Sequence, residues 1–192
     1  MPQIMPDVEN DQLSLRLTAM ELRHPGLTAA TAMTFYEAAQ VCLDRHHRPP
    51  MTFSIEDEGT AIGANALWEP ADANCQAAHA NETDATSWGA YCCALASTEV
   101  VRGLVAVRRA ENGTGADYYL DAPQASSTDL EHAVRLEVSG TDEGTTQQIR
   151  TRLLQKASQA RHGNSNLPAL AAVVGFKALK IAMCNVSSHE LD

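Results

Sequence analysis

The chain has few aromatic residues, which make up only 5% of its 192 positions. Apolar residues still reach 44%, so the interior must consist mostly of alanine, valine and leucine. A chain of this length and apolar content is typical of one folded domain and argues against wholesale disorder. The sequence therefore predicts a globular protein with a core of small aliphatic side chains.

The sequence also lacks any apolar run approaching the roughly 18 residues that indicate a transmembrane helix. Its first residues, MPQIMPDVENDQLSLRL, are acidic and lack the basic and apolar regions of a secretory signal. The five cysteines include no CxxC pair, which argues against a zinc ribbon or a disulfide framework and fits a reducing compartment. We therefore expect a cytoplasmic protein without membrane contact.

Basic residues are in the minority, with 14 lysines and arginines against 24 acids and a net charge of −10. This balance argues against a generally basic nucleic-acid coat protein. The charges are unevenly placed, because residues 1–143 carry 22 acids and 8 bases, whereas residues 144–189 carry six bases and no acid. The second stretch can meet a polyanion, or it can be a solvated helix face that balances the acidic half. The acidic half is in turn a candidate surface for a protein partner.

Several familiar catalytic motifs are missing. The GTGAD run at residues 113–117 lacks the lysine of a phosphate-binding loop, and no G-x-S-x-G elbow is present. His46 and His47 are adjacent and so do not share a helical face from which to bind a metal ion. A P-loop nucleotide hydrolase and an α/β-hydrolase are therefore not expected.

The first half of the chain has weak secondary-structure patterns. Thr28 or Thr31 can cap a helix that runs to about Asp44. Alternating apolar residues predict a strand over 51–57. Residues 58–83 are rich in alanine, glycine, asparagine and aspartate, which indicates an irregular connection, with room for a short strand around Trp68.

The second half has stronger patterns. Its predicted elements are, in order, a helix at 85–101, strands at 104–110, 116–121 and 133–139, a helix at 145–160 and a strand at 168–176. The Asn112-Gly113 pair favours a hairpin between the first two strands, and the second helix makes a crossover to the last strand. The fold class is therefore α/β with a mixed sheet. Residues 84–192 would form the core, and residues 1–83 a helix and strand extension packed on it.

This order of elements resembles the core of the restriction-endonuclease-like, or PD-(D/E)XK, nuclease superfamily. In that family an acid on the second core strand and an E-x-K motif on the third hold Mg²⁺, and the first helix often adds a glutamate. Here Asp117, in GTGADYYL, matches the first acid, and Glu137, in RLEVSG, matches the second. Glu99 takes the place of the helical glutamate. The resemblance covers residues 85–176.

The main departure from the family pattern is Ser139, which stands where the family usually has lysine. That lysine orients the attacking water and stabilises the charged transition state, and serine has no charge with which to do so. Arg135 on the same strand face, or Arg150 or Lys156 from the next helix, can substitute for it. Otherwise the chain has kept the fold and lost the chemistry.

The resemblance implies a Mg²⁺-dependent phosphodiesterase acting on nucleic acid, in a bacterial defence or DNA-maintenance setting. Asp117 and Glu137 would share the ion, because neighbouring strands bring side chains on one face close together. Four basic residues are candidates for nucleic-acid contacts: Arg135, Arg150, Arg152 and Lys156. The alternative is an inactive protein of the same fold that serves as a binding or structural subunit.

The candidate acids also have plainer explanations. Glu137 can pair with Arg135 or Arg108 at a sheet edge. Asp117 can simply end the hairpin, and Glu99 can form an ion pair near the end of its helix. The sequence alone leaves these alternatives open.

Overall fold

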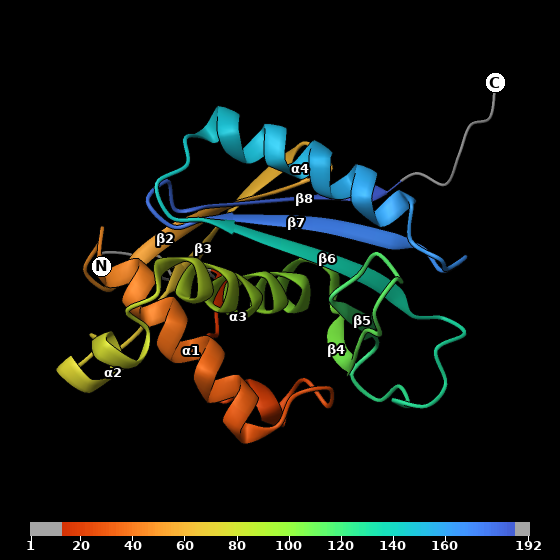
Figure 1. The fold of residues 1–192 in the computed structure, drawn as a ribbon, viewed down its shortest axis with the longest axis horizontal. Coiled ribbons are helices and arrows are strands. Elements are labelled where there is room, and N and C mark those ends of the chain that lie inside the picture. Colours follow the sequence, from red (N-terminus) through yellow and green to blue (C-terminus); the bar gives the residue numbers. More distant parts are fainter. Residues whose placement is uncertain (1–12, 187–192) are drawn as a thin grey trace, which may run out of the picture.

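The computed structural model describes residues 13–186, which form one eight-stranded mixed sheet with helices on both faces (Figure 1). The strands are β1 (Leu13–Leu15), β2 (Met51–Asp57), β3 (Thr60–Ala66), β4 (Val105–Arg109), β5 (Tyr118–Asp121), β6 (Val134–Thr141), β7 (Ala169–Gly175) and β8 (Lys180–Val186). The helices are α1 (Ala29–Asp44), α2 (Ala73–Ala78), α3 (Glu82–Arg102) and α4 (Thr146–Arg161), with one turn of 3-10 helix at Met20–Leu22. The predicted α/β class with a mixed sheet is confirmed.

The sheet has the strand order β1-β3-β2-β8-β7-β6-β5-β4. Helices α1 and α3 cover one face, and α4 covers the other (Figure 1). Strands β4, β5 and β6 form an antiparallel meander, and β7 lies parallel to β6 after the α4 crossover, as predicted. Within the described residues, none of the helices is both long and apolar enough to cross a membrane.

The N-terminal part of the chain continues this same sheet. Strand β2 pairs antiparallel with β3 and parallel with β8, and β1 adds to the outer side of β3. Thr28 caps α1, because its hydroxyl accepts the amide of Thr31, as expected. The expectation of an irregular connection over 58–83 was wrong, since this stretch contains β3 and α2. The TAIGANA sequence of β3 offers only small side chains, so its alternation gives little hydrophobic signal.

The core is built from small aliphatic residues, as the composition predicts. Every residue of β7 is buried, and the middle of α3 is a run of buried alanine, cysteine and leucine. Gly140 on β6 allows α3 to lie very close to the sheet. A β-carbon at this position would lie 2.5 Å from the carbonyl oxygen of Thr86. Small residues therefore hold the first turns of α3 beside the C-terminal half of β6.

Candidate active site

A pocket of about 540 Å³ opens beside β6 where its neighbour β5 stops. Strand β5 pairs with β6 only as far as Tyr118, which lies opposite Leu136. The following part of β6, from Val138 to Thr141, therefore has an open edge that forms the floor of the pocket. The first turns of α3 make one wall, and α4 makes the other. The meander and the crossover thus create a polar cleft between two helices.

Asp117 lines this cleft and is the residue just before β5 begins. The β5–β6 register continues to place it opposite Glu137. Its Oδ1 accepts a hydrogen bond from the Tyr91 hydroxyl at 2.7 Å, and its Oδ2 accepts the backbone N–H of Val138 at 2.8 Å. The carboxylate is therefore fixed across the open edge of β6. The structure brings Asp117 and Glu137 together on the same pocket, as expected from the sequence.

Lys156 of α4 reaches into the pocket and contacts Glu137. Its Nζ donates to Glu137 Oε1 at 2.7 Å. Burial raises the pKa of Glu137; the hydrogen bond from Lys156 opposes this shift, and the charge of Asp117 adds to it. A lysine is thus present beside the second acid, but it comes from the facing helix and not from the strand.

Ser139 and Arg152 also line the pocket. Arg152 Nη1 donates to the Gly140 carbonyl at 2.6 Å and lies 3.4 Å from the Ser139 hydroxyl. The rest of the Arg152 side chain is exposed. The pocket is therefore lined by two basic side chains, Arg152 and Lys156, and by two carboxylates, Asp117 and Glu137, with Lys156 and Glu137 in direct contact.

Glu99 does not reach the pocket. It lies eight residues after Tyr91 on α3, about 12 Å along the helix axis. There both of its oxygens lie 2.9 Å from Arg23 Nε and share its single N–H, and it forms an ion pair with Arg16. His24 Nε2 lies 3.4 Å from the same carboxylate. The structure thus supports the plainer explanation for Glu99, an ion pair near the helix end.

Two of the four candidate nucleic-acid contacts also lie elsewhere. Arg135 is buried and donates to the backbone carbonyls of Leu167, Thr114 and Ala160. It cannot take over the role of the missing lysine, because its guanidinium already serves those three acceptors. Arg150 is exposed on α4 but turns toward Glu56, at 3.4 Å. Of the four bases, only Arg152 and Lys156 line the pocket.

The sequence did not reveal two residues that shape the site, Tyr91 and Arg109. Burial raises the pKa of Tyr91 to about 12, and the charge of Asp117 acts in the same direction, so Tyr91 stays a neutral donor to Asp117. The guanidinium of Arg109 lies over the rings of Tyr91 and Tyr118, at 4.8 and 4.7 Å from their centroids. Neither belongs to a motif, because Tyr91 meets Asp117 across 26 residues and Arg109 meets Tyr118 through the pairing of β4 with β5.

A second cluster of titratable side chains lies outside this pocket. Among residues 13–186, Glu37, Cys75 and His79 form the one group of three or more metal-ligand side chains whose ligand atoms all lie within 4.8 Å of one another. Its sulfur and nitrogen atoms differ from the oxygen ligands that Mg²⁺ prefers. The structure therefore contains one candidate metal cluster that the sequence patterns did not indicate.

The chain matches no family model, and comparisons with curated proteins and with solved structures found no match either. Function has to be inferred from the chemistry of the pocket itself. Its main features are two carboxylates, a lysine in contact with one of them, and an exposed arginine on the same wall.

Proposed function

We propose that this protein is a metal-dependent phosphodiesterase that cleaves nucleic acid, with a restriction-endonuclease-like core. The observation that carries the proposal is the meeting of Asp117, Glu137 and Lys156 in one pocket, with Lys156 Nζ 2.7 Å from Glu137. These three residues come from separate segments of the chain. A site made of the two acids alone would have no need of a lysine. The order of β4 to β8, with α3 and α4 on opposite faces, is consistent with that core.

The two carboxylates suit a hard divalent cation such as Mg²⁺. Mg²⁺ is commonly held by one or two carboxylates, several waters and phosphate oxygens of the substrate. Asp117 and Glu137 would hold the ion, and their mutual repulsion, which contributes to the raised pKa of Glu137, would be relieved by it. When bound, such an ion makes water a better nucleophile and neutralises charge that develops on phosphorus.

Lys156 supplies the positive charge that Ser139 lacks. An ammonium group has three N–H donors, and the contact with Glu137 uses one of them. The remaining donors can orient a water or contact a phosphate oxygen at the pocket. The Glu137 contact holds Nζ in place, because the carboxylate is half-enclosed between β6 and α4.

The other pocket residues bind and position. Arg152 is exposed beside Lys156 and presents a planar donor group, which suits a phosphate diester. Tyr91 and the Val138 amide each hold one oxygen of Asp117, so that this carboxylate keeps a single orientation. A nucleic-acid backbone would thus enter beside α4 and meet the acids at the open edge of β6.

The central test is cleavage of single- and double-stranded DNA and RNA with Mg²⁺, with Mn²⁺ and with chelator. Lys156→Ala should lower the metal-dependent rate by about 100-fold or more, in the range typical of a lost acid–base or electrostatic group. Lys177→Ala is the matched control, because Lys177 is exposed and pairs with Glu143 outside the pocket. Cleavage that survives chelator and is equal in both variants would refute the proposal.

A second variant tests whether a lysine on strand β6 can replace Lys156. Ser139 lies two residues from Glu137 on the same strand face and lines the same pocket. Ser139→Lys should therefore restore part of the cleavage lost in Lys156→Ala, whereas Thr151→Lys in the same background should not. Equal rates for the two double variants would show that the position of the charge is irrelevant.

A further inference from the structure

The cluster of Glu37, Cys75 and His79 lies where α2 packs against α1. Cys75 is on α2, His79 is the residue that ends this helix, and Glu37 projects from α1. His79 Nε2 lies 3.2 Å from Glu37 Oε2, and the Cys75 thiol contacts the Glu37 carbonyl at 3.7 Å. We propose that these three side chains bind one transition-metal ion of the zinc class. This proposal is independent of the proposed nuclease activity.

The spacing and the donor types both favour zinc. Cys75 and His79 are four residues apart, so they lie on the same side of one helical turn. Thiolate, imidazole and carboxylate are the ligands of zinc sites, whereas Mg²⁺ and Ca²⁺ take oxygen atoms alone. A tetrahedral zinc ion with normal bond lengths holds its ligand atoms about 3.3 to 3.8 Å apart. The three atoms lie within 4.8 Å, so small side-chain rotations would complete the geometry.

The local charge is suited to a divalent cation. A Cys75 thiolate and the Glu37 carboxylate together balance two positive charges. Zinc binding would displace the thiol proton, so the occupied site would carry no net charge.

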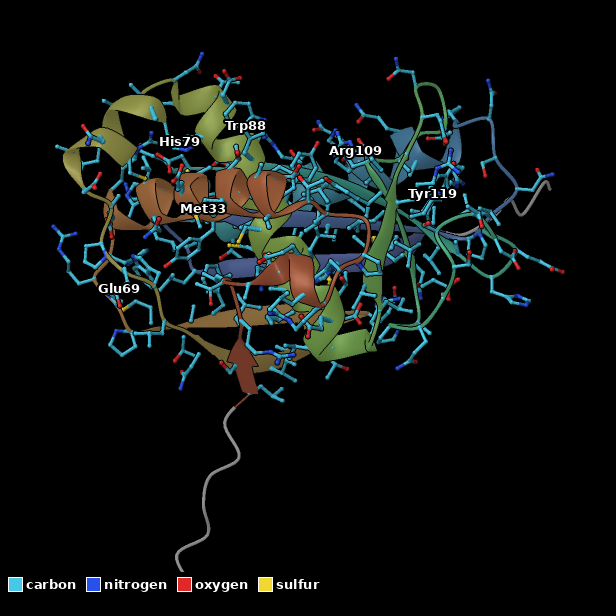
Figure 2. The ribbon with its side chains drawn as sticks, turned by 90° about the horizontal axis from the view of Figure 1, so that it is seen from below. Met33, Glu69, His79, Trp88, Arg109 and Tyr119 are labelled. Atoms are coloured by element: carbon cyan, nitrogen blue, oxygen red, sulfur yellow. The ribbon has the colours of Figure 1, made fainter. Side chains whose placement is uncertain are left out.

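His79 provides a second observation that points to a ligand. Its imidazole is buried, and none of the described residues gives its Nδ1 a hydrogen-bond partner. A buried polar nitrogen without a partner costs free energy, and an ion bound at Nδ1 would remove that cost. Trp88 lies edge-on to the ring, with ring centroids 5.9 Å apart. Figure 2 shows the two labelled side chains next to each other. The Glu37 side chain is 38% exposed, so water can supply the fourth ligand.

A metal ion would also explain how α2 keeps its place. This helix has six residues, and none of them is buried. Helices this short are unstable in isolation and depend on tertiary contacts. Two of the three ligands belong to the α2 turn and the third to α1, so the ion would join the two helices. We therefore assign it a structural role.

The test is metal titration of the full chain after treatment with chelator. Co²⁺ serves as the probe, because its bonds to thiolate and imidazole give visible and near-ultraviolet absorption bands. We expect one ion per chain and a sulfur-to-cobalt band that Zn²⁺ removes by competition. Cys75→Ser should abolish that band, and Glu37→Gln should weaken binding by about tenfold or more, comparable to the loss of a neighbouring metal-site group. Cys184→Ser, which changes a half-buried thiol outside the cluster, should bind as the wild type does.

A stability measurement is needed as well, because Cys75→Ser would also bind nothing if it misfolded. Zn²⁺ should raise the melting temperature of the wild type and of Cys184→Ser, since a ligand that binds only the folded state stabilises it. The rise should be smaller in Glu37→Gln, which keeps the side-chain volume but binds the ion more weakly. A wild type without the cobalt band, or a band that persists in Cys75→Ser, would overturn the assignment.

Discussion

The acids near the two ends of α3 lie in opposite electrostatic environments. Near its C-terminal end, Glu99 is surrounded by Arg16, Arg23 and His24. Burial alone would raise the pKa of Glu99, but the hydrogen bond from Arg23 and the nearby positive charges lower it overall. Near the N-terminal end, the helix walls a pocket in which burial and Asp117 raise the pKa of Glu137 despite Lys156.

This difference separates an acid that supports the fold from one that is available for chemistry. Arg23 also donates to the carbonyls of Arg16, Thr18 and Ala19, so the Glu99 cluster ties the segment before α1 to α3. An acid that is stabilised on all sides has little free energy to gain from a ligand. An acid whose ionised form is disfavoured gains more from a cation, and such groups concentrate at functional sites.

The largest effect is expected when the charge of Glu137 is removed. Glu137→Gln should lower metal-dependent cleavage by about 1,000-fold or more, because one of the two proposed metal ligands is lost. Its free energy of unfolding should stay within about 1 kcal/mol of the wild type, because the lost carboxylate was poorly stabilised. Urea unfolding and the cleavage rate measure the two effects. A variant that loses stability but keeps its rate would assign Glu137 to the fold.

Lowering the pH should first destabilise the cluster around Glu99. Burial lowers the pKa of His24 from 6.5 to about 4, although the charge of Glu99 opposes this, and His24 Nδ1 accepts the Ala106 amide at 3.0 Å. Since the folded pKa is lower than the unfolded value, the folded state binds fewer protons between pH 6.5 and pH 4. Stability should therefore be complete above pH 6.5 and fall by about 3 kcal/mol as the pH drops to 4. His24→Gln should flatten this dependence in urea unfolding, whereas a slope unchanged in the variant would contradict the assignment.

Glu99→Gln tests the same end by mutation. It should lower the free energy of unfolding by about 2 kcal/mol, because Arg23 and Arg16 lose a charged acceptor. Cleavage by the folded variant should equal that of the wild type. Glu143→Gln is the control, since Glu143 is exposed and has only a weak pair with Lys177. A loss of cleavage beyond the loss of stability would return Glu99 to the active site.

The smallest expected effect concerns Arg152. Arg152→Gln should weaken nucleic-acid binding by about tenfold and reduce the slope of log affinity against log salt by about 1, as expected for one lost phosphate contact. Arg150→Gln should change neither, because Arg150 turns toward Glu56. Fluorescence anisotropy over a series of salt concentrations makes both measurements. Equal effects of the two changes would show that the basic surface of α4 binds without using the pocket.

The sequence predicted the elements from α3 to β7 closely, whereas strand β8 was not part of the predicted order. The strands predicted at 104–110, 116–121 and 133–139, with the Asn112-Gly113 turn between the first two, correspond to β4, β5 and β6 of the meander. Gly103 ends α3 with a φ of 65°, as its position after the helical pattern indicates. These signals are local, because each depends on residues that are neighbours in the chain. Strand β3 was not predicted, because its side chains are small and are buried only through contacts with other elements.

In the candidate site, too, local sequence patterns predict one part and tertiary packing decides the other. Strand alternation and pairing order place Asp117 beside Glu137, so the sequence could predict that pair. The choice between Arg135, Arg150 and Lys156 depended on the direction of each side chain from its element, which only the packing of α4 on β6 decides. Glu99 matched the family position by its stripe on the helix, but a stripe does not show which end of α3 meets the pocket. The Glu37, Cys75 and His79 cluster likewise depends on α2 docking against α1, across a sequence gap that carries no motif.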